Sequence, residues 1–314
     1  MSKPTVFVTS ATGTVGSALA RQLLDLDYTV HFTTRSPSSP SALSLTTLGA
    51  RVFPSPSGWD DTTALTTALQ SCTHLFLNTF PNFTDPSQEV TQATSILRIA
   101  KTSGVSHVVY SGALPTYNLP QWNPSHWSAG IRLAKMEIEG AVREAGIQHW
   151  TVLRPGYFMA NFLGEKTGFQ FPGVRETGEF LHGFGKAREE VLPLVDERDI
   201  ARFAVAAFEE PGRFHGKEIA VASEGVEVGR VMEVLRRVSG REVRGVYVSG
   251  EEREGKEGRV RMALENQVSF EGLDGLVDWE ALKRWGVELG TFEAYLERER
   301  EAVEETYGGL NKVE

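Results

Sequence analysis

The segment that most constrains the fold is the first apolar run together with the residues that follow it. Residues 5–9 are apolar or β-branched, residues 9–14 are small, and an apolar pattern with helical spacing then runs over Val15–Leu26. A short buried strand, a tight turn and an amphipathic helix in this order are typical of the first unit of a parallel sheet. The free N–H groups at such a helix start, together with the helix dipole, favour an anion in the turn. A pyrophosphate fits there, with Gly13 allowing close approach of the backbone and Gly16 allowing close packing of helix on strand.

Strand-like and helix-like segments continue to alternate up to residue 155. This alternation predicts an α/β fold with a doubly wound parallel sheet. The expected strands are Thr5–Thr9, Thr29–Thr33, Arg51–Phe53, His74–Leu77, His107–Tyr110 and His149–Leu153. The expected helices are Val15–Leu26, Ser41–Leu48, Thr63–Leu69, Ser87–Thr102 and Ser128–Glu144.

The pattern changes after Pro155, where glycines separate short aromatic segments up to about residue 190. This predicts an irregular region, whose aromatic residues either line a pocket or form plain core. The charge run Glu251–Arg261 is expected to lie in solvent. Helices are expected further on at Arg198–Glu209, Val228–Val238, Asp278–Trp285 and Thr291–Thr306, and strands at Glu218–Ala222 and Val243–Val248.

Charge is distributed unevenly along the 314 residues. Residues 1–131 hold 6 basic and 6 acidic side chains, and residues 132–314 hold 26 and 35, which accounts for the net charge of −9. Basic residues scattered among acidic ones argue against nucleic acid as a ligand. No apolar run approaches the roughly 18 residues of a membrane helix, no secretory signal is recognisable, and the single cysteine, Cys72, has no disulfide partner. The histidines are dispersed, so no metal site is predicted. We expect a soluble cytoplasmic protein with neither a nucleic-acid nor a membrane partner.

A second binding signal lies at the end of the second expected strand. Arg35 stands 19 residues beyond Gly16 and is followed by Ser36. A carboxylate at this point accepts hydrogen bonds from the adenosine ribose of NAD, whereas an arginine suits the extra phosphate of NADP because guanidinium binds phosphate in a forked geometry. Arg35 therefore favours NADP(H), with Ser36 as a further contact. The alternative is a surface arginine at the start of a loop.

Several motifs follow one another along the chain in a characteristic order. They are the turn Thr9–Gly16, Arg35, the segment Ala100–Ser111, Lys135 and the segment Thr151–Asn161. In order and spacing they resemble the NmrA-like family of atypical short-chain dehydrogenases/reductases. The resemblance implies a Rossmann-like NADP-binding domain over residues 1–155, rejoined by residues 191–222. It implies a smaller mixed α/β substrate region with C-terminal helices over residues 156–314. It also implies NADP(H) binding with either reductase activity or redox sensing, and several fungal members act in natural-product pathways.

The resemblance also places cofactor contacts on particular residues of this chain. Lys135 corresponds to the lysine that contacts the nicotinamide ribose, and Ser111 lies where dehydrogenases keep a substrate-orienting serine. The remaining expected contacts are Ser10, Thr12, Gly13, Thr14 and Val15 in the first turn, Asn78, Thr79 and Phe80 after the fourth strand, and Pro155 and Phe158 after the sixth.

Two departures from the usual short-chain dehydrogenase pattern affect the expected chemistry. The catalytic tyrosine normally stands four residues before the lysine, and Ile131 occupies that position here. This leaves the proton donor open, with Lys135 as a candidate general acid. The candidate replacement acids are Tyr157, Tyr117 and His126. Ser10 replaces the first glycine of the phosphate turn, which puts the tightness of that turn in question.

Three functions are consistent with these features. The first is an NADPH-dependent reductase of a hydrophobic carbonyl, imine or activated alkene. The second is a catalytically silent NADP(H) sensor that acts on a protein partner, which the missing tyrosine favours. The third is a non-redox biosynthetic enzyme on the same fold. Substrate identity, stereochemistry and oligomeric state do not follow from the sequence.

Overall fold

The computed structural model describes residues 3–313, and the chain divides into two compact units. Unit 1 comprises Met1–Ala113, Pro124–Pro155 and Ile200–Val221. Unit 2 comprises Leu114–Asn123, Gly156–Asp199 and Ala222–Glu314. Over the described part of the chain, no helix has the length and apolar character needed to cross a membrane.

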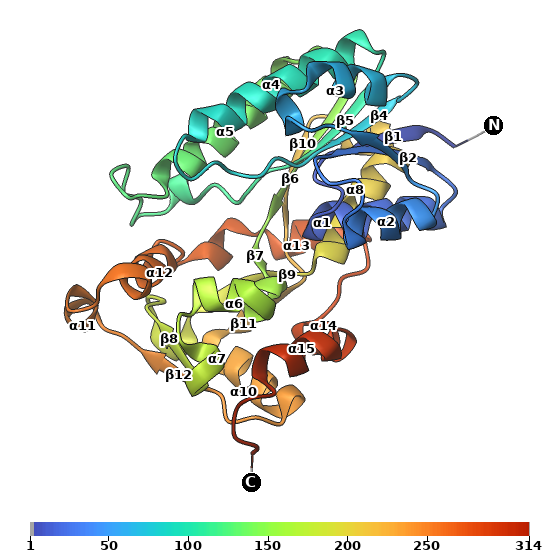
Figure 1. Ribbon diagram of the computed structural model, residues 1–314. Helices are drawn as coiled ribbons and strands as arrows, with labels where there is room; N and C mark the ends of the chain where they lie inside the picture. The colour runs from blue at the N-terminus through green and yellow to red at the C-terminus, as the bar shows by residue number, and fades with distance from the viewer. Residues whose placement is uncertain (1–2, 314) are drawn as a thin grey trace. The chain divides into compact units, whose positions relative to one another are not determined.

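Unit 1 is built on a seven-stranded parallel sheet, seen in the upper part of Figure 1. Its strand order is β10-β6-β5-β4-β1-β2-β3. Because β1 lies inside the sheet and the chain winds outward from it in both directions, this is the doubly wound, Rossmann-like order, and the expected fold is confirmed. The strands are β1 (Thr5–Val8), β2 (Thr29–Thr34), β3 (Arg51–Pro54), β4 (His74–Leu77), β5 (His107–Ser111), β6 (His149–Pro155) and β10 (Lys217–Val221).

Helices cover both faces of this sheet (Figure 1). The strands are apolar on both faces for this reason, and Val6, Phe7 and Val8 of β1 are all fully buried. One face carries α1 (Thr14–Asp25), α2 (Pro40–Thr47) and α8 (Glu197–Glu209), and the other carries α3 (Thr62–Leu69), α4 (Pro86–Thr102) and α5 (Ala129–Glu144). The short helix α9 (Pro211–Phe214) precedes β10.

The turn between β1 and α1 is tight despite the serine at the first glycine position. Ser10 takes a left-handed backbone conformation with φ of 49°, which glycine usually provides. Its carbonyl accepts a hydrogen bond from Gly13 N at 2.8 Å, and its hydroxyl donates to the carbonyl of Asn78 at 2.8 Å. A Cβ on Gly16 would lie 2.2 Å from the carbonyl oxygen of Ser10. The turn therefore depends on glycine at position 16 and tolerates serine at position 10.

Unit 2 contains two small sheets and several helices. β11 (Glu224–Glu227), β9 (Val191–Val195) and β7 (Tyr157–Phe158) form one sheet, and β12 (Arg244–Tyr247) pairs with β8 (Glu179–His182) in the other. The helices are α6 (Gly164–Gln170), α7 (Val174–Thr177), α10 (Val228–Ser239), α11 (Gly250–Glu254), α12 (Gly258–Val268), α13 (Trp279–Arg284), α14 (Phe292–Arg298) and α15 (Arg300–Tyr307).

The region predicted to be irregular is more ordered than its glycines suggested. It holds two short helices, β7 and β8, and most of its aromatic residues form core, whereas Phe169 is 55% exposed. Phe162 stacks on Phe171 with ring centroids 5.5 Å apart, and Phe171 packs edge-on against Phe180 at 4.9 Å. All three side chains are fully buried, so they do not line a pocket.

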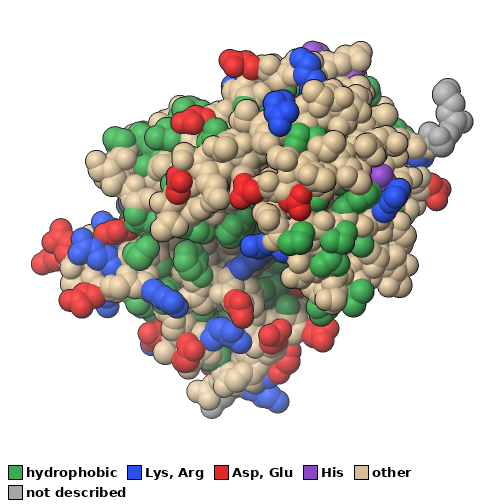
Figure 2. Space-filling model, turned by 45° about the horizontal axis from the view of Figure 1, so that its top comes forward, with side chains coloured by type: hydrophobic (Ala, Val, Ile, Leu, Met, Phe, Trp, Pro, Cys, Tyr) green, Lys and Arg blue, Asp and Glu red, His purple; other side chains and the backbone are tan. Residues whose placement is uncertain are grey.

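One expectation for unit 2 needs correction, and one is confirmed with more detail. The single helix expected at Thr291–Thr306 is broken at Glu299 into α14 and α15. The run Glu251–Arg261 is largely exposed, as expected, but it is helical over much of its length, and Ser249 begins α11 with a capping box. On the face shown in Figure 2, acidic and basic side chains are dense over unit 2 and sparse over unit 1.

A row of histidines crosses the sheet of unit 1 at the amino ends of its strands. His74, His107 and His149 are paired in register on β4, β5 and β6. The rings of His74 and His107 lie 5.5 Å apart, and both rings pack edge-on against Phe208. Burial lowers the pKa of His74 to about 4 and that of His107 to about 3. Both side chains are therefore neutral in the folded protein at neutral pH.

This row predicts acid sensitivity of unit 1. Both folded-state pKa values lie below the unfolded value of about 6.5. The unfolding free energy is therefore not reduced by these histidines above that pH. It falls as the pH drops toward 4, because the unfolded state binds protons that the folded state does not. Replacing His107 with Leu should reduce the pH slope of the unfolding free energy by up to about 1.4 kcal/mol per pH unit. Urea unfolding of both proteins between about pH 7 and about pH 5 measures this slope. Equal slopes would contradict the assignment.

The phosphate turn predicts that replacing Gly16 with Ala lowers the unfolding free energy much more than replacing Gly140 with Ala. Gly16→Ala forces a side-chain carbon against the backbone of Ser10 and should lower the unfolding free energy by roughly 3 kcal/mol or more, since neither backbone can move aside. Gly140→Ala is the matched control, because a Cβ at Gly140 in α5 meets no atom within 4 Å. It should be neutral or stabilising by up to about 1 kcal/mol. Similar unfolding midpoints for the two variants would show that the close contact at Gly16 is not limiting.

Candidate functional site

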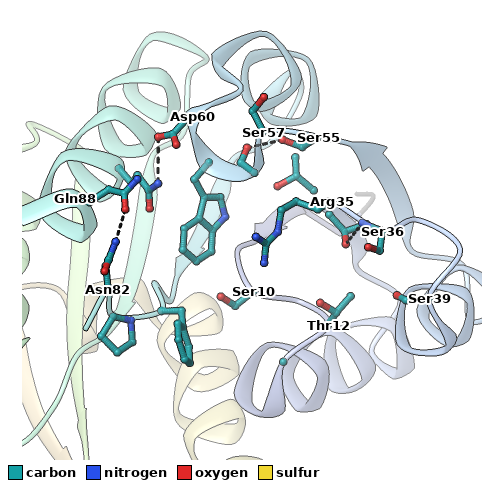
Figure 3. A pocket seen from close by; sticks show the side chains of 18 of the residues that line it. Ser10, Thr12, Arg35, Ser36, Ser39, Ser55, Ser57, Asp60, Asn82 and Gln88 are labelled. Atoms are coloured by element: carbon teal, nitrogen blue, oxygen red, sulfur yellow. Dashed lines mark hydrogen bonds between the residues drawn. The ribbon is translucent and has the colours of Figure 1, made fainter. Parts of the chain in front are cut away.

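A polar pocket of about 780 Å³ opens in unit 1 at the carboxyl ends of the first strands. It is built by the turn after β1, the end of β2, the loop after β3 with its 3₁₀ turn η1 (Gly58–Asp60), the loop after β4 and the start of α4 (Figure 3). Ligands of doubly wound sheets bind at this edge, where the strand order reverses between β1 and β4. Its lining residues are Ser10, Thr12, Gly13, Thr33, Thr34, Arg35, Ser36, Ser39, Ser55, Ser57, Gly58, Trp59, Asp60, Phe80, Pro81, Asn82, Phe83, Thr84, Gln88 and Gln92.

One end of the pocket is the start of α1. Three of the predicted cofactor contacts, Ser10, Thr12 and Gly13, line it. Gly13 is the N-cap of α1 and brings no capping side chain, so the positive end of the helix dipole faces the pocket. Thr14 and Val15 form the first helical turn and are not among the lining residues; Val15 is 6% exposed and packs into the core. This end fits a pyrophosphate.

The other end holds the single cation among the lining residues. Arg35 leaves the end of β2 and reaches into the pocket, with Ser10 and Thr12 facing it from the first turn (Figure 3). Hydroxyl groups of Ser36, Ser39, Ser55 and Ser57 surround this end. The single acidic lining residue, Asp60, accepts a hydrogen bond from Gln92 at 3.1 Å. A guanidinium among hydroxyls, with no acidic residue at the end of β2, fits a phosphate ester better than a ribose diol.

The aromatic residues of the pocket were only partly predicted. Phe80 lines it as expected and is 69% exposed, and its ring lies 6.1 Å from that of Phe83. Trp59 was missed: it packs in part against the core of unit 1 and also lines the pocket. Exposed aromatic faces beside a phosphate site are suited to stacking on a nucleobase. The sequence signal for Trp59 was its place directly after the third strand and a Ser-Pro-Ser-Gly turn.

Asn78 and Thr79 act structurally rather than as pocket walls. The backbone N–H of Asn78 donates to the Thr9 hydroxyl at 2.6 Å, and its carbonyl accepts from Thr9 and Ser10. These bonds fix the loop after β4 to the phosphate turn. The Thr79 side chain is buried and donates to Glu89 Oε1 at 2.6 Å.

Lys135 lies in a buried ion pair that the sequence reasoning missed. Its ammonium on α5 donates to Glu89 Oε1 on α4 at 2.6 Å and to the carbonyl of Thr79 at 2.9 Å. The Glu89 side chain is fully buried. A sequence signal did exist, because Glu89 is the single glutamate among the first 131 residues.

The remaining predicted residues do not line this pocket. In unit 1, Ser111 ends β5 with 2% exposure, and Pro155 ends β6. In unit 2, Tyr157 and Phe158 form β7. The Tyr157 hydroxyl donates to Gln170 at 3.4 Å, and burial raises its pKa. The role of Tyr157 as a proton donor stays a prediction. The described residues contain no group of three His, Cys, Asp or Glu side chains placed to hold a metal.

Comparison of the sequence with known proteins identifies a family and a related reductase. The family model described as the NmrA-like family matches residues 2–296. The (4-alkanoyl-5-oxo-2,5-dihydrofuran-3-yl)methyl phosphate reductase of Streptomyces griseus is 32% identical over 240 residues, which cover 76% of this chain and 75% of that protein.

Solved structures of two further proteins share the fold. The negative transcriptional regulator NmrA in complex with NADP superposes with a TM-score of 0.72 at 18% identity, covering 96% of this chain and 97% of that one. The NADPH-dependent quinone oxidoreductase of Escherichia coli complexed with NADPH gives 0.70 at 21% identity, with coverage of 94% and 99%. From the family match and the 32% relative together, the chain belongs to the NmrA-like family.

Proposed function

We propose that this protein is an NADP(H)-dependent oxidoreductase that reduces a hydrophobic small molecule. The observation that carries the proposal is Arg35, which reaches from the end of β2 into the same pocket as the phosphate turn. A helix start for the pyrophosphate and a guanidinium for a phosphate on the adenosine ribose together match one ligand, NADP(H). The Streptomyces reductase and the Escherichia coli quinone oxidoreductase, by their names, support reduction as the reaction.

Residues of unit 1 hold the cofactor in this proposal. Gly13 and the first turn of α1 bind the pyrophosphate, Arg35 and Ser36 bind the 2′-phosphate, and Trp59 and Phe80 provide aromatic surface for the adenine. Lys135 provides a positive charge at the carboxyl ends of the strands. When bound, NADPH supplies a hydride for a carbonyl, an imine or an activated alkene.

A second candidate function is a redox sensor that binds NADP(H) and acts through a protein partner. Two observations favour it. Ile131 replaces the usual proton-donating tyrosine, and the structural neighbour NmrA is named as a transcriptional regulator in complex with NADP. The two functions share the cofactor pocket and differ in turnover.

Cofactor preference tests the role of Arg35. Arg35→Ala should weaken NADPH binding by roughly 10- to 100-fold, because a hydrogen-bonded charge contributes about 1.5–3 kcal/mol, and should change NADH binding less than about threefold. Isothermal titration with each dinucleotide measures both affinities. Arg98→Ala is the matched control, since Arg98 is also exposed in unit 1 but lies on α4 outside the pocket lining. Equal losses for NADPH and NADH would remove the NADP assignment.

Turnover tests the reductase against the sensor. The wild-type protein should oxidise NADPH faster than NADH with at least one substrate among panels of hydrophobic quinones, enones, ketones and imines. The loss of nicotinamide absorbance, followed together with substrate loss by mass spectrometry, measures this. Tight NADPH binding without turnover on any panel would contradict the reductase and favour the sensor. No binding of either dinucleotide would contradict both.

A further inference from the structure

The ion pair between Lys135 and Glu89 joins α5 to α4, and α4 also contributes Gln88 and Gln92 to the pocket lining. Glu89 follows Gln88 on α4, and Thr79 precedes Phe80 in the loop after β4; both Gln88 and Phe80 line the pocket. The two acceptors of Lys135, the Glu89 carboxylate and the Thr79 carbonyl, therefore belong to residues next to the pocket lining on two different elements.

The burial of Glu89 needs an explanation, because an ionised carboxylate is costly to bury unless it is paired and hydrogen-bonded. Its Oε1 accepts from Lys135 and from the Thr79 hydroxyl, each at 2.6 Å. Its Oε2 is buried and has no hydrogen-bond partner among the described residues. The ionised carboxylate of Glu89 is thus stabilised by the hydrogen bonds to Oε1 and by the positive charge of Lys135.

The Lys135 ammonium has more hydrogen-bond donors than acceptors around it in the structure. An ammonium carries three N–H donors. Among residues 3–313, two of the donors have recorded acceptors, namely Glu89 Oε1 and the carbonyl of Thr79. The side chain keeps 13% exposure. The third donor has no acceptor among the described residues.

We propose that Glu89 is a positioning residue that holds Lys135 as a fixed ammonium, with one N–H directed to the bound dinucleotide or substrate. This inference rests on the proposed function of the pocket. Loss of the Lys135 proton would leave the Glu89 carboxylate buried without a counter-charge. Lys135 therefore supplies charge and orientation, and it is not the proton donor.

The test is the chemical reactivity of Lys135 in the protein without cofactor. Reductive methylation requires a neutral amine, so an amine fixed as an ammonium reacts slowly. Mass spectrometry of peptides gives the rate at Lys135 relative to Lys101, which is exposed on α4. Glu89→Gln keeps the shape of the side chain and removes its charge, so the relative rate at Lys135 should rise at least about tenfold.

A matched control separates charge from burial. Glu137→Gln removes an exposed carboxylate from the same helix as Lys135 and should leave the relative rate unchanged. If burial alone protects Lys135, Glu89→Gln will also leave the rate unchanged, because it opens no new surface; that result would overturn the proposal.

A second measurement covers the case in which Glu89→Gln folds poorly. In a cycle of Glu89→Gln, Lys135→Met and the double variant, the double variant should have a higher urea midpoint than Glu89→Gln alone, since it removes the uncompensated ammonium. Independent, additive midpoint losses would contradict a coupled pair.

Cofactor protection separates this inference from the proposed function. Saturating NADPH should slow methylation of Lys135 at least about threefold in Glu89→Gln, where the residue is reactive. If Glu89→Gln activates Lys135 but NADPH does not protect it, the ion pair holds and the placement of the dinucleotide fails.

Discussion

The close contact between the start of α1 and the turn after β1 is the constraint on which the site depends. A glycine at position 16 lets the helix approach the carbonyl of Ser10, and that approach places the positive end of the helix dipole in the pocket. The same turn is tied through Ser10 and Thr9 to the backbone of Asn78. The loops after β1 and β4 are thereby held together, and the loop after β4 brings Thr79 to Lys135.

Unit 1 contains few charged side chains, and the burial of its sheet explains the uneven distribution of charge along the chain. A parallel sheet covered by helices on both faces leaves little room for charged side chains. Of the few in the first 131 residues, Arg35 lines the pocket, and Glu89 is buried on α4, which also carries Gln88 of the pocket lining. The first is placed to attract an anionic ligand, and the second is placed to hold the cation at Lys135. The dense charges of unit 2 lie largely on its surface (Figure 2).

The sequence was most informative where burial leaves a local pattern. Each strand of unit 1 is a short apolar run between helices, so β4 was predicted to the residue and the other strands to within two residues. The small sheets of unit 2 were harder, because β7 has two residues and pairs with β9 more than thirty positions later, which no local pattern marks. Arg35, Gly13 and Phe80 followed from motif position. Glu89 did not, since a glutamate in a helix ordinarily faces solvent, and Trp59 did not because the loop after β3 carries no motif.

The pocket of unit 1 and the family to which the chain belongs support the proposed NADP(H)-dependent reduction. In the proposed function, unit 1 binds the dinucleotide through Gly13 and Arg35. Ile131 stands at the position of the usual proton-donating tyrosine. The most direct measurement is a crystal structure of the protein with NADP. We expect the pyrophosphate at Gly13 and the 2′-phosphate within hydrogen-bonding distance of Arg35. A dinucleotide bound with its 2′-phosphate away from Arg35, or an empty pocket at saturating NADP, would contradict the account.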